Sequence, residues 1–206
     1  MKSPRGFALP TLMVMLALAS LAALLALRNL WVTEQLLRAS ADQLRTLHKA
    51  HAALPLAVAD IIGTSNQTSN SRHAAGNPTQ THAFFPTSMA EYDTLRQRLS
   101  PNMCGAGICV PQALPTTATK ASYWKTQTAT ALPIATTQTP YGDNTIWYWV
   151  EVFPQANRTP DNFIYRITVH ANGMLPSSSV VVQAIWARTT PTSSSGQWHS
   201  WHVLHD

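Results

Sequence analysis

The chain has 206 residues, enough for one modest domain with an extension or for two small domains at most. Charged residues make up only 11% of it, against about a quarter in a typical soluble domain. The net charge is +5, but the basic residues are scattered and form neither a basic stripe with interleaved aromatics nor a zinc-finger spacing. The composition therefore argues against nucleic acid as a partner.

An apolar segment, residues 7–27, contains no charged side chain. As a helix it would be roughly 30 Å long, which matches the hydrocarbon core of a bilayer. Lys2 and Arg5 precede it and Arg28 follows it. Positive charges on the short leader favour a cytoplasmic N-terminus, so we expect the larger C-terminal part on the other side of the membrane.

Two other kinds of apolar segment compete with this interpretation. A secretory signal peptide has an apolar core of about 7–15 residues followed by a small-residue cleavage site. Here the run is longer, and it continues without a polar boundary into Trp31 and Val32. A plain single-pass anchor remains an alternative.

The leader is more specific than a plain anchor requires. Its residues Lys2-Ser3-Pro4-Arg5-Gly6, followed by Phe7, resemble the class III signal of type IV prepilins. The resemblance implies that residues 1–6 are removed by a prepilin peptidase between Gly6 and Phe7, and that the new amino group of Phe7 is methylated. Residues 7–27 would then be first a membrane anchor and later a helix in the core of a filament.

One position departs from the pilin pattern. Most pilins carry a Glu four residues after the cleaved Phe, and its carboxylate is thought to pair with the N-terminal ammonium of a neighbouring subunit. Here the residue is Thr11, whose hydroxyl cannot neutralise an ammonium. The tip subunit of the related secretion pseudopili also lacks this Glu. The resemblance therefore implies a minor, priming or tip-associated pilin.

From Arg28 the pattern becomes amphipathic, and residues 28–62 are predicted to continue the helix into a head domain. Apolar residues recur at steps of three and four, with polar residues on the other face. Pro55 is expected to kink or end the helix near Leu54. A polar run at 64–81 is predicted to be an exposed loop.

The remaining chain, residues 63–206, is predicted to form a periplasmic head. Residues 89–99 have a helical pattern. Cys104 and Cys109 lie in a segment expected outside the cytoplasm, which favours one disulfide over a pair of free thiols. Residues 116–139, rich in Thr and Ala, are interpreted as irregular strands and loops.

Three strands are predicted near residues 145–153, 162–170 and 179–188, from β-branched and aromatic runs with short connections. They form an antiparallel meander with one face on the amphipathic helix, so the expected fold class is α+β. The runs FIYRITVHANG (163–173) and SSSVVVQAIWAR (177–188) resemble the closing strands of PilX/PilV-type minor pilins.

Candidate chemistry is sparse. The sequence contains no glycine-rich phosphate loop, G-x-S-x-G elbow or H-E-x-x-H motif, and no cofactor is predicted. His199, His202 and His205 would share one face of a helix and are a weak candidate metal site, but a polar aromatic tail is the favoured interpretation. Trp147, Trp149 and Trp186 are expected in the core or at subunit contacts.

These features predict a structural protein and not an enzyme. The expected partners are other pilins, the prepilin peptidase, the inner-membrane assembly machinery and, before assembly, membrane lipid. The expected location is the inner membrane with a periplasmic head, and then a cell-surface pilus. Two alternatives remain: a minor pseudopilin of a type II secretion system, and a membrane-anchored periplasmic binding or sensor module.

Overall fold

The computed structural model describes residues 8–62, 85–86, 88–99, 104–109, 114–134, 146–155, 162–175, 178–190, 193 and 195–206. The chain divides into two compact units, Met1–Ala41 and Asp42–Asp206. The predicted α+β class is confirmed, with one long helix and a mostly antiparallel sheet. The predicted loop at 64–81 lies outside the described residues.

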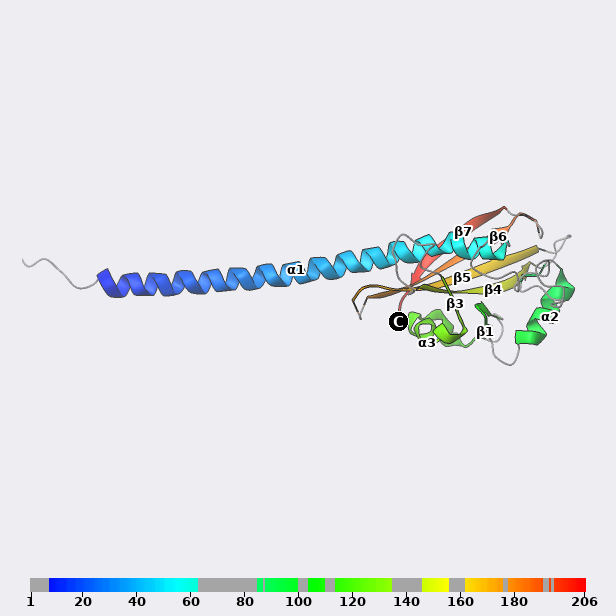
Figure 1. Cartoon of the computed structure of the whole chain (residues 1–206), viewed down its shortest axis with the longest axis horizontal. Helices are drawn as coiled ribbons and strands as arrows, with labels where there is room; N and C mark the ends of the chain where they lie inside the picture. Colours follow the sequence, from blue (N-terminus) through cyan, green and yellow to red (C-terminus); the bar gives the residue numbers. More distant parts are fainter. Residues whose placement is uncertain are drawn as a thin grey trace, which may run out of the picture. The chain divides into compact units, whose positions relative to one another are not determined.

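Helix α1 runs from Ala8 to Ile61 over 54 residues, as one uninterrupted ribbon in Figure 1. Pro55 was expected to kink or end the helix, and the second of these outcomes is wrong, because Pro55 lies inside α1. The helix continues to Ile61, close to the predicted end at residue 62. Proline in a helix interior costs about 3 kcal/mol. Pro55 itself is exposed, whereas Ala53 and Ala57 on either side are fully buried in the head. Packing on both sides of the proline holds the helix together.

Four long antiparallel strands form the body of the sheet. They are β4 (Ile146–Gln155), β5 (Asn162–Asn172), β6 (Ser179–Arg188) and β7 (Gly196–Leu204). The first three are the predicted strands, with bounds that agree to within two residues. Their faces are both covered, which explains why each reads as an almost continuous apolar run.

Strand β7 corrects the expectation of a polar aromatic tail. It pairs antiparallel with β6, from Leu204 opposite Val181 to Gly196 opposite Arg188, and it is the last strand of the sheet. Its exposed Trp198 and Trp201 made the segment resemble a tail. β7 is a strand because β6 supplies partners for its backbone hydrogen bonds. This pairing cannot be inferred from the residue pattern of the segment alone.

Three short strands extend the other side of the sheet. β1 (Cys104–Gly105) and β2 (Ile108–Cys109) form a hairpin, and β2 runs parallel to β4. β3 (Leu132–Pro133) pairs antiparallel with β4.

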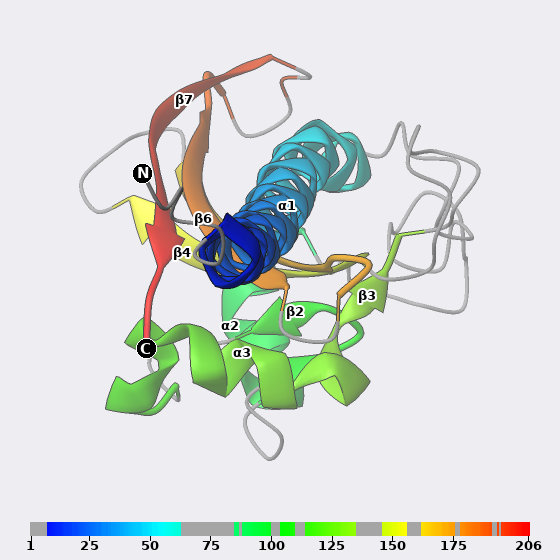
Figure 2. The same ribbon diagram turned by 90° about the vertical axis from the view of Figure 1, so that its left-hand side faces the viewer.

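One face of the sheet carries the main core. The second half of α1 lies against this face, as Figure 2 shows in end view, and helix α2 (Met89–Leu99) contributes to the same core. α2 has the predicted bounds and buries Tyr92, Leu95 and Leu99. Its first turn is capped by the hydroxyl of Ser88, which accepts from the backbone N–H of Glu91 at 3.3 Å.

The opposite face carries a smaller core under three helical turns: η4 (Thr116–Thr119), α3 (Ala121–Thr126) and η5 (Thr128–Thr130). Irregular strands were expected here, so that prediction is wrong for these residues. Trp124 is fully buried against Trp149, and its indole donates to the carbonyl of Ala118 at 2.8 Å. Burying such a ring contributes about 1.5–3 kcal/mol, enough to impose a turn on a Thr/Ala segment.

Two of the three tryptophans expected in the core or at subunit contacts lie in the core. Trp149 and Trp186 are buried, and Trp147 is half-buried on the second face.

Candidate functional site

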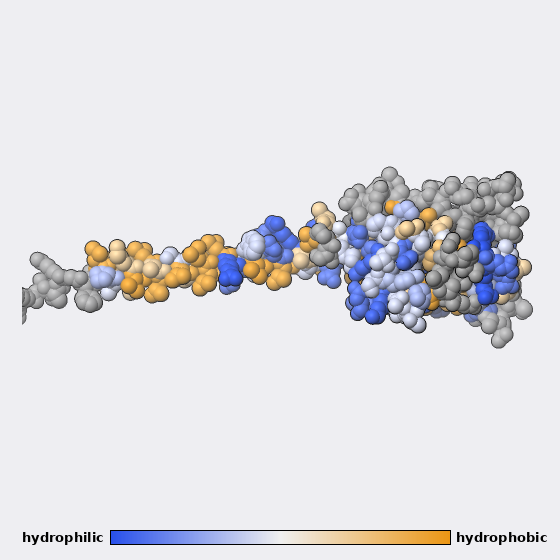
Figure 3. Space-filling view, turned by 90° about the horizontal axis from the view of Figure 1, so that it is seen from below, coloured by the Kyte–Doolittle hydropathy of each residue, from blue (hydrophilic) through white to orange (hydrophobic). Residues whose placement is uncertain are grey.

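The first unit presents an apolar helix surface on all sides. From Leu9 to Leu27 the Leu, Met and Val side chains are 56% to 72% exposed. Figure 3 shows this segment as a mostly hydrophobic surface. By length and composition α1 is the one helix in the described part of the chain that could cross a membrane. Such a helix suggests either membrane anchoring or a signal sequence.

Beyond the apolar run, the helix carries charge. Arg28 is the first charged residue after it, and Glu34 and Arg38 form an exposed ion pair one turn apart at 2.6 Å. An exposed pair at this spacing stabilises a helix by only about 0.3–0.5 kcal/mol, so it contributes little to the stability of this segment. Thr11 lies in the first turns of the described helix. Gly6 and Phe7 lie outside the described residues, so the cleavage site stays a prediction.

In the second unit, polar contacts bind the part of α1 that begins at Asp42 to the turn between β5 and β6. The Asp42 carboxylate accepts from the backbone N–H groups of Met174 at 3.1 Å and Leu175 at 3.0 Å. These groups belong to the turn between β5 and β6. The N–H of Leu175 above all lowers the pKa of Asp42, against the opposing effect of burial. Lys49 adds a bond to the carbonyl of Asn172 at 3.3 Å.

A second set of contacts holds the C-terminal end of the helix. The Tyr148 hydroxyl donates to Asp60 at 2.8 Å, and the Arg188 guanidinium donates to the carbonyl of Ile61. A cation at a helix C-terminus also interacts favourably with the helix dipole. Sequence reasoning missed both sets of contacts. The available signal was the spacing of the charged residues: Lys49 lies four residues before Ala53, Asp60 lies three after Ala57, and Asp42 lies two turns before Lys49, so all three share the buried face of α1.

The predicted disulfide is present between Cys104 and Cys109. It closes the β1–β2 hairpin, whose turn contains Ala106 at φ 47° and Gly107 at φ 75°. A Cβ on Gly107 would lie 2.9 Å from the Cβ of Leu132. Both cysteines are buried and belong with Trp149 to the smaller core, so the bridge stabilises the head.

The histidine motif does not form the helical face on which a metal site would depend. His199 and His202 lie in β7, and His205 follows its end. Side chains three apart on a strand point to opposite faces. Among the residues that the structure describes, no group of three or more His, Cys, Asp or Glu is placed to hold a metal ion.

Two buried ionisable groups were not anticipated from the sequence. Glu151 is fully buried and receives two bonds from Arg166, at 2.6 Å from Nε and 2.5 Å from Nη2. Burial raises the pKa of Glu151, and the Arg166 guanidinium acts in the opposite direction. His170, only 3% exposed, lies on the same face of the sheet beside a cavity.

No protein-family model, curated protein or solved structure matches this chain significantly.

Proposed function

We propose that the protein is a minor pilin: a membrane-stored subunit that enters or primes a type IV pilus through its N-terminal helix. One observation carries the proposal. A single helix is apolar and exposed on all sides in its first half and forms the core of an antiparallel head in its second half. This is a pilin-like architecture, in which one element serves as anchor, filament spine and domain core.

The continuity of α1 supports this function over a cleaved secretory signal. Residues 42–61 supply Ala50, Ala53, Ala57 and Ile61 to the head core, each fully buried. A cut after the apolar run would leave the head with a long exposed helical stub. A cut before Phe7 leaves the whole element intact, as the prepilin-like leader implies.

The position of Thr11 supports a minor or tip role. A shaft subunit needs a partner for the N-terminal ammonium of its neighbour, since an uncompensated charge in apolar surroundings is strongly unfavourable. A minor pseudopilin of a type II secretion system shares this N-terminal device and is the second candidate. The same absence of a carboxylate at residue 11 favours it.

Intact-mass measurement and N-terminal sequencing of the protein extracted from membranes test the proposal. We expect a mature chain that lacks residues 1–6 and begins with N-methylated Phe7. Gly6→Val should leave the leader uncut while the protein remains in the membrane. A mature chain that begins after the apolar run would overturn the proposal, and so would an intact leader in cells that process other prepilins.

A further inference from the structure

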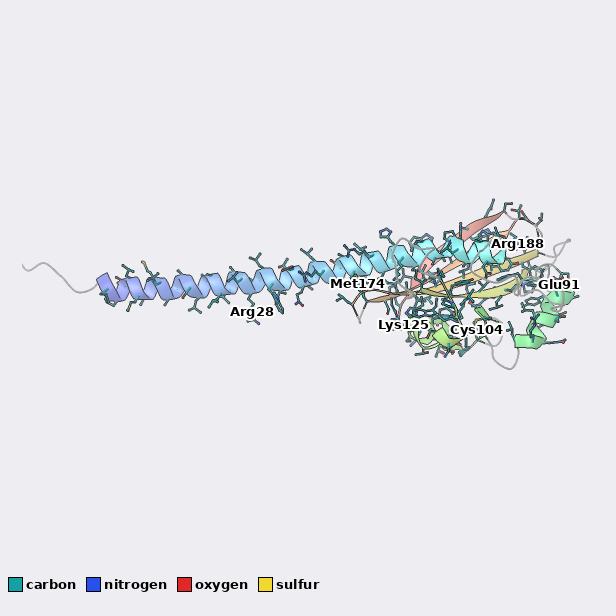
Figure 4. All side chains as sticks on the ribbon, viewed as in Figure 1. Arg28, Glu91, Cys104, Lys125, Met174 and Arg188 are labelled. Atoms are coloured by element: carbon teal, nitrogen blue, oxygen red, sulfur yellow. A yellow bond between two sulfur atoms is a disulfide. The ribbon has the colours of Figure 1, made fainter. Side chains whose placement is uncertain are left out.

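A cavity of about 380 Å³ opens between α3 and the β5–β6 turn. Its walls include Lys125, His170, Asn172, Met174, Ser178 and Ser179. Figure 4 labels Lys125 and Met174, which reach this end of the head from the two different elements. The volume falls in the range of small-molecule sites, about 300–1,000 Å³.

His170 is the unusual residue of the cavity wall. It is 3% exposed, and neither ring nitrogen has a hydrogen-bond partner in the described part of the chain. One face of the ring stacks on Trp147 at 5.4 Å between centroids. Burial, together with the nearby charge of Lys125, lowers the pKa of His170 to about 4, and the neighbouring Asn172 side chain acts in the opposite direction, so the ring is neutral at pH 7. An unsatisfied buried polar group costs about 1–3 kcal/mol, so a ligand oxygen or nitrogen that met this ring would recover that free energy.

The charge of the cavity indicates the kind of ligand. Lys125 is the one charged residue among the described residues that line it. Its ammonium lies 3.6 Å from the Asp206 carboxylate, longer than an ordinary hydrogen bond, so it can still donate to another oxygen. The hydroxyl of Ser179 and an imidazole N–H add neutral donors. Two carboxylates adjoin the wall without lining it: Asp206 beside Lys125, and Asp42, which already accepts from the N–H groups of the β5–β6 turn. The groups that do line the cavity are one cation and neutral donors, which suit an oxyanion.

We propose that this cavity binds a small organic oxyanion, with Lys125 contacting its phosphate or carboxylate group and His170 serving as the buried hydrogen-bond donor. The site lies wholly within the head unit and does not depend on cleavage of the leader or on assembly into a filament. Absence of oxyanion binding would therefore leave the proposed pilin function unaffected. Evidence against the pilin function would likewise leave the proposed binding site unaffected.

The test is a titration of the full chain in detergent, labelled with ¹⁵N in its histidine rings. The His170 signals are identified by their loss in His170→Gln. The probes are glycerol 3-phosphate, inorganic phosphate and acetate, with glycerol as the uncharged control. We expect a saturable shift of the His170 signals with a Kd near or below about 1 mM for at least one anion, and none with glycerol. Tighter binding of the phosphates than of acetate would identify a phosphate site, and the reverse a carboxylate site.

Two lysine variants make the result specific. Lys125→Met should weaken binding at least about tenfold, because it removes the charged donor. Lys120→Met removes an exposed lysine that does not line the cavity and should leave the Kd unchanged. Ser179→Ala, which keeps every charge, should weaken binding by a smaller factor and covers the case in which Lys125→Met fails to fold. The proposal is wrong if no probe gives a saturable shift, or if neither Lys125→Met nor Ser179→Ala changes it.

Discussion

Glu151 and Arg166 illustrate how a single buried pair can constrain the second face of the sheet. The two residues are directly opposite each other on β4 and β5, and the Arg166 guanidinium also lies 5.0 Å from the centroid of the Phe153 ring. Glu151 is fully buried, whereas the Arg166 side chain is one-third exposed. The cost of burying the carboxylate is therefore offset by a partner that itself stays partly hydrated.

Removing that partner should be more harmful than removing the pair. We expect Arg166→Met to lower the free energy of unfolding by about 2–3 kcal/mol, somewhat less than the roughly 3–5 kcal/mol of a fully buried pair because the arginine is partly exposed. The double variant Glu151→Gln/Arg166→Met should recover much of this loss. Chemical denaturation of both variants in detergent, compared with the unchanged chain, measures the difference.

Arg166→Met should also change how the stability of the head depends on pH. Burial raises the folded-state pKa of Glu151, and without Arg166 nothing on this pair opposes that effect. A raised carboxyl pKa means that the folded state holds its proton more tightly, so stability is lost as pH rises through the folded-state value. Arg166→Met should therefore become relatively more stable towards acid pH. An equal deficit at all pH values would contradict this explanation.

At the scale of elements, the connection between α1 and the β5–β6 turn depends on close approach. A Cβ on Gly173 would lie 2.5 Å from the Thr46 hydroxyl, 2.6 Å from the Asp42 carboxylate and 2.7 Å from the Cβ of Ser178. Glycine is needed here because the helix and the turn leave no room for a methyl group. The hydrogen bonds from Asp42 to this turn depend on the same spacing.

Gly173→Ala should therefore push the turn away from the helix and destabilise the head by about 1–3 kcal/mol. Gly105→Ala is a matched control, because its Cβ would meet its nearest neighbour, Leu99, at 3.4 Å. Thermal unfolding, monitored by near-ultraviolet circular dichroism, measures the melting temperatures of the two alanine variants. Equal melting temperatures for the two alanine variants would show that the turn adapts without cost.

At the scale of the whole molecule, the proposed function assigns the apolar half of α1 first to the membrane and then to a filament. If Thr11 restricts the protein to a minor or tip position, Thr11→Glu should allow or increase incorporation along filaments, because the carboxylate can pair with a neighbouring ammonium. Sheared filaments analysed by quantitative immunoblotting measure the incorporated fraction. Thr33→Glu, which adds the same charge beyond the apolar run, should leave that fraction unchanged. Loss of assembly in Thr11→Glu alone would count against the tip assignment.

The elements that could be predicted are encoded by residue patterns within a single segment of the chain. Helix α2 and strands β4, β5 and β6 have strong periodic patterns, and the two cysteines lie close enough in sequence to pair. The parts that were missed depend on partners distant in the chain. α3 forms because Trp124 is buried against Trp149, and β7 is a strand because β6 is beside it.

By itself, the sequence determined that this protein has a long apolar helix at its N-terminus, a β-rich head and the α+β class, since runs of apolar residues and their period are properties of a chain segment alone. Only the tertiary structure decided that α1 passes through Pro55, which side chains bind the helix to the sheet, and that His170 faces a cavity beside Lys125. These depend on residues separated by up to about 130 positions, as Asp42 and Leu175 are. Contacts over such separations arise only when the sheet assembles around the helix, so no local pattern records them.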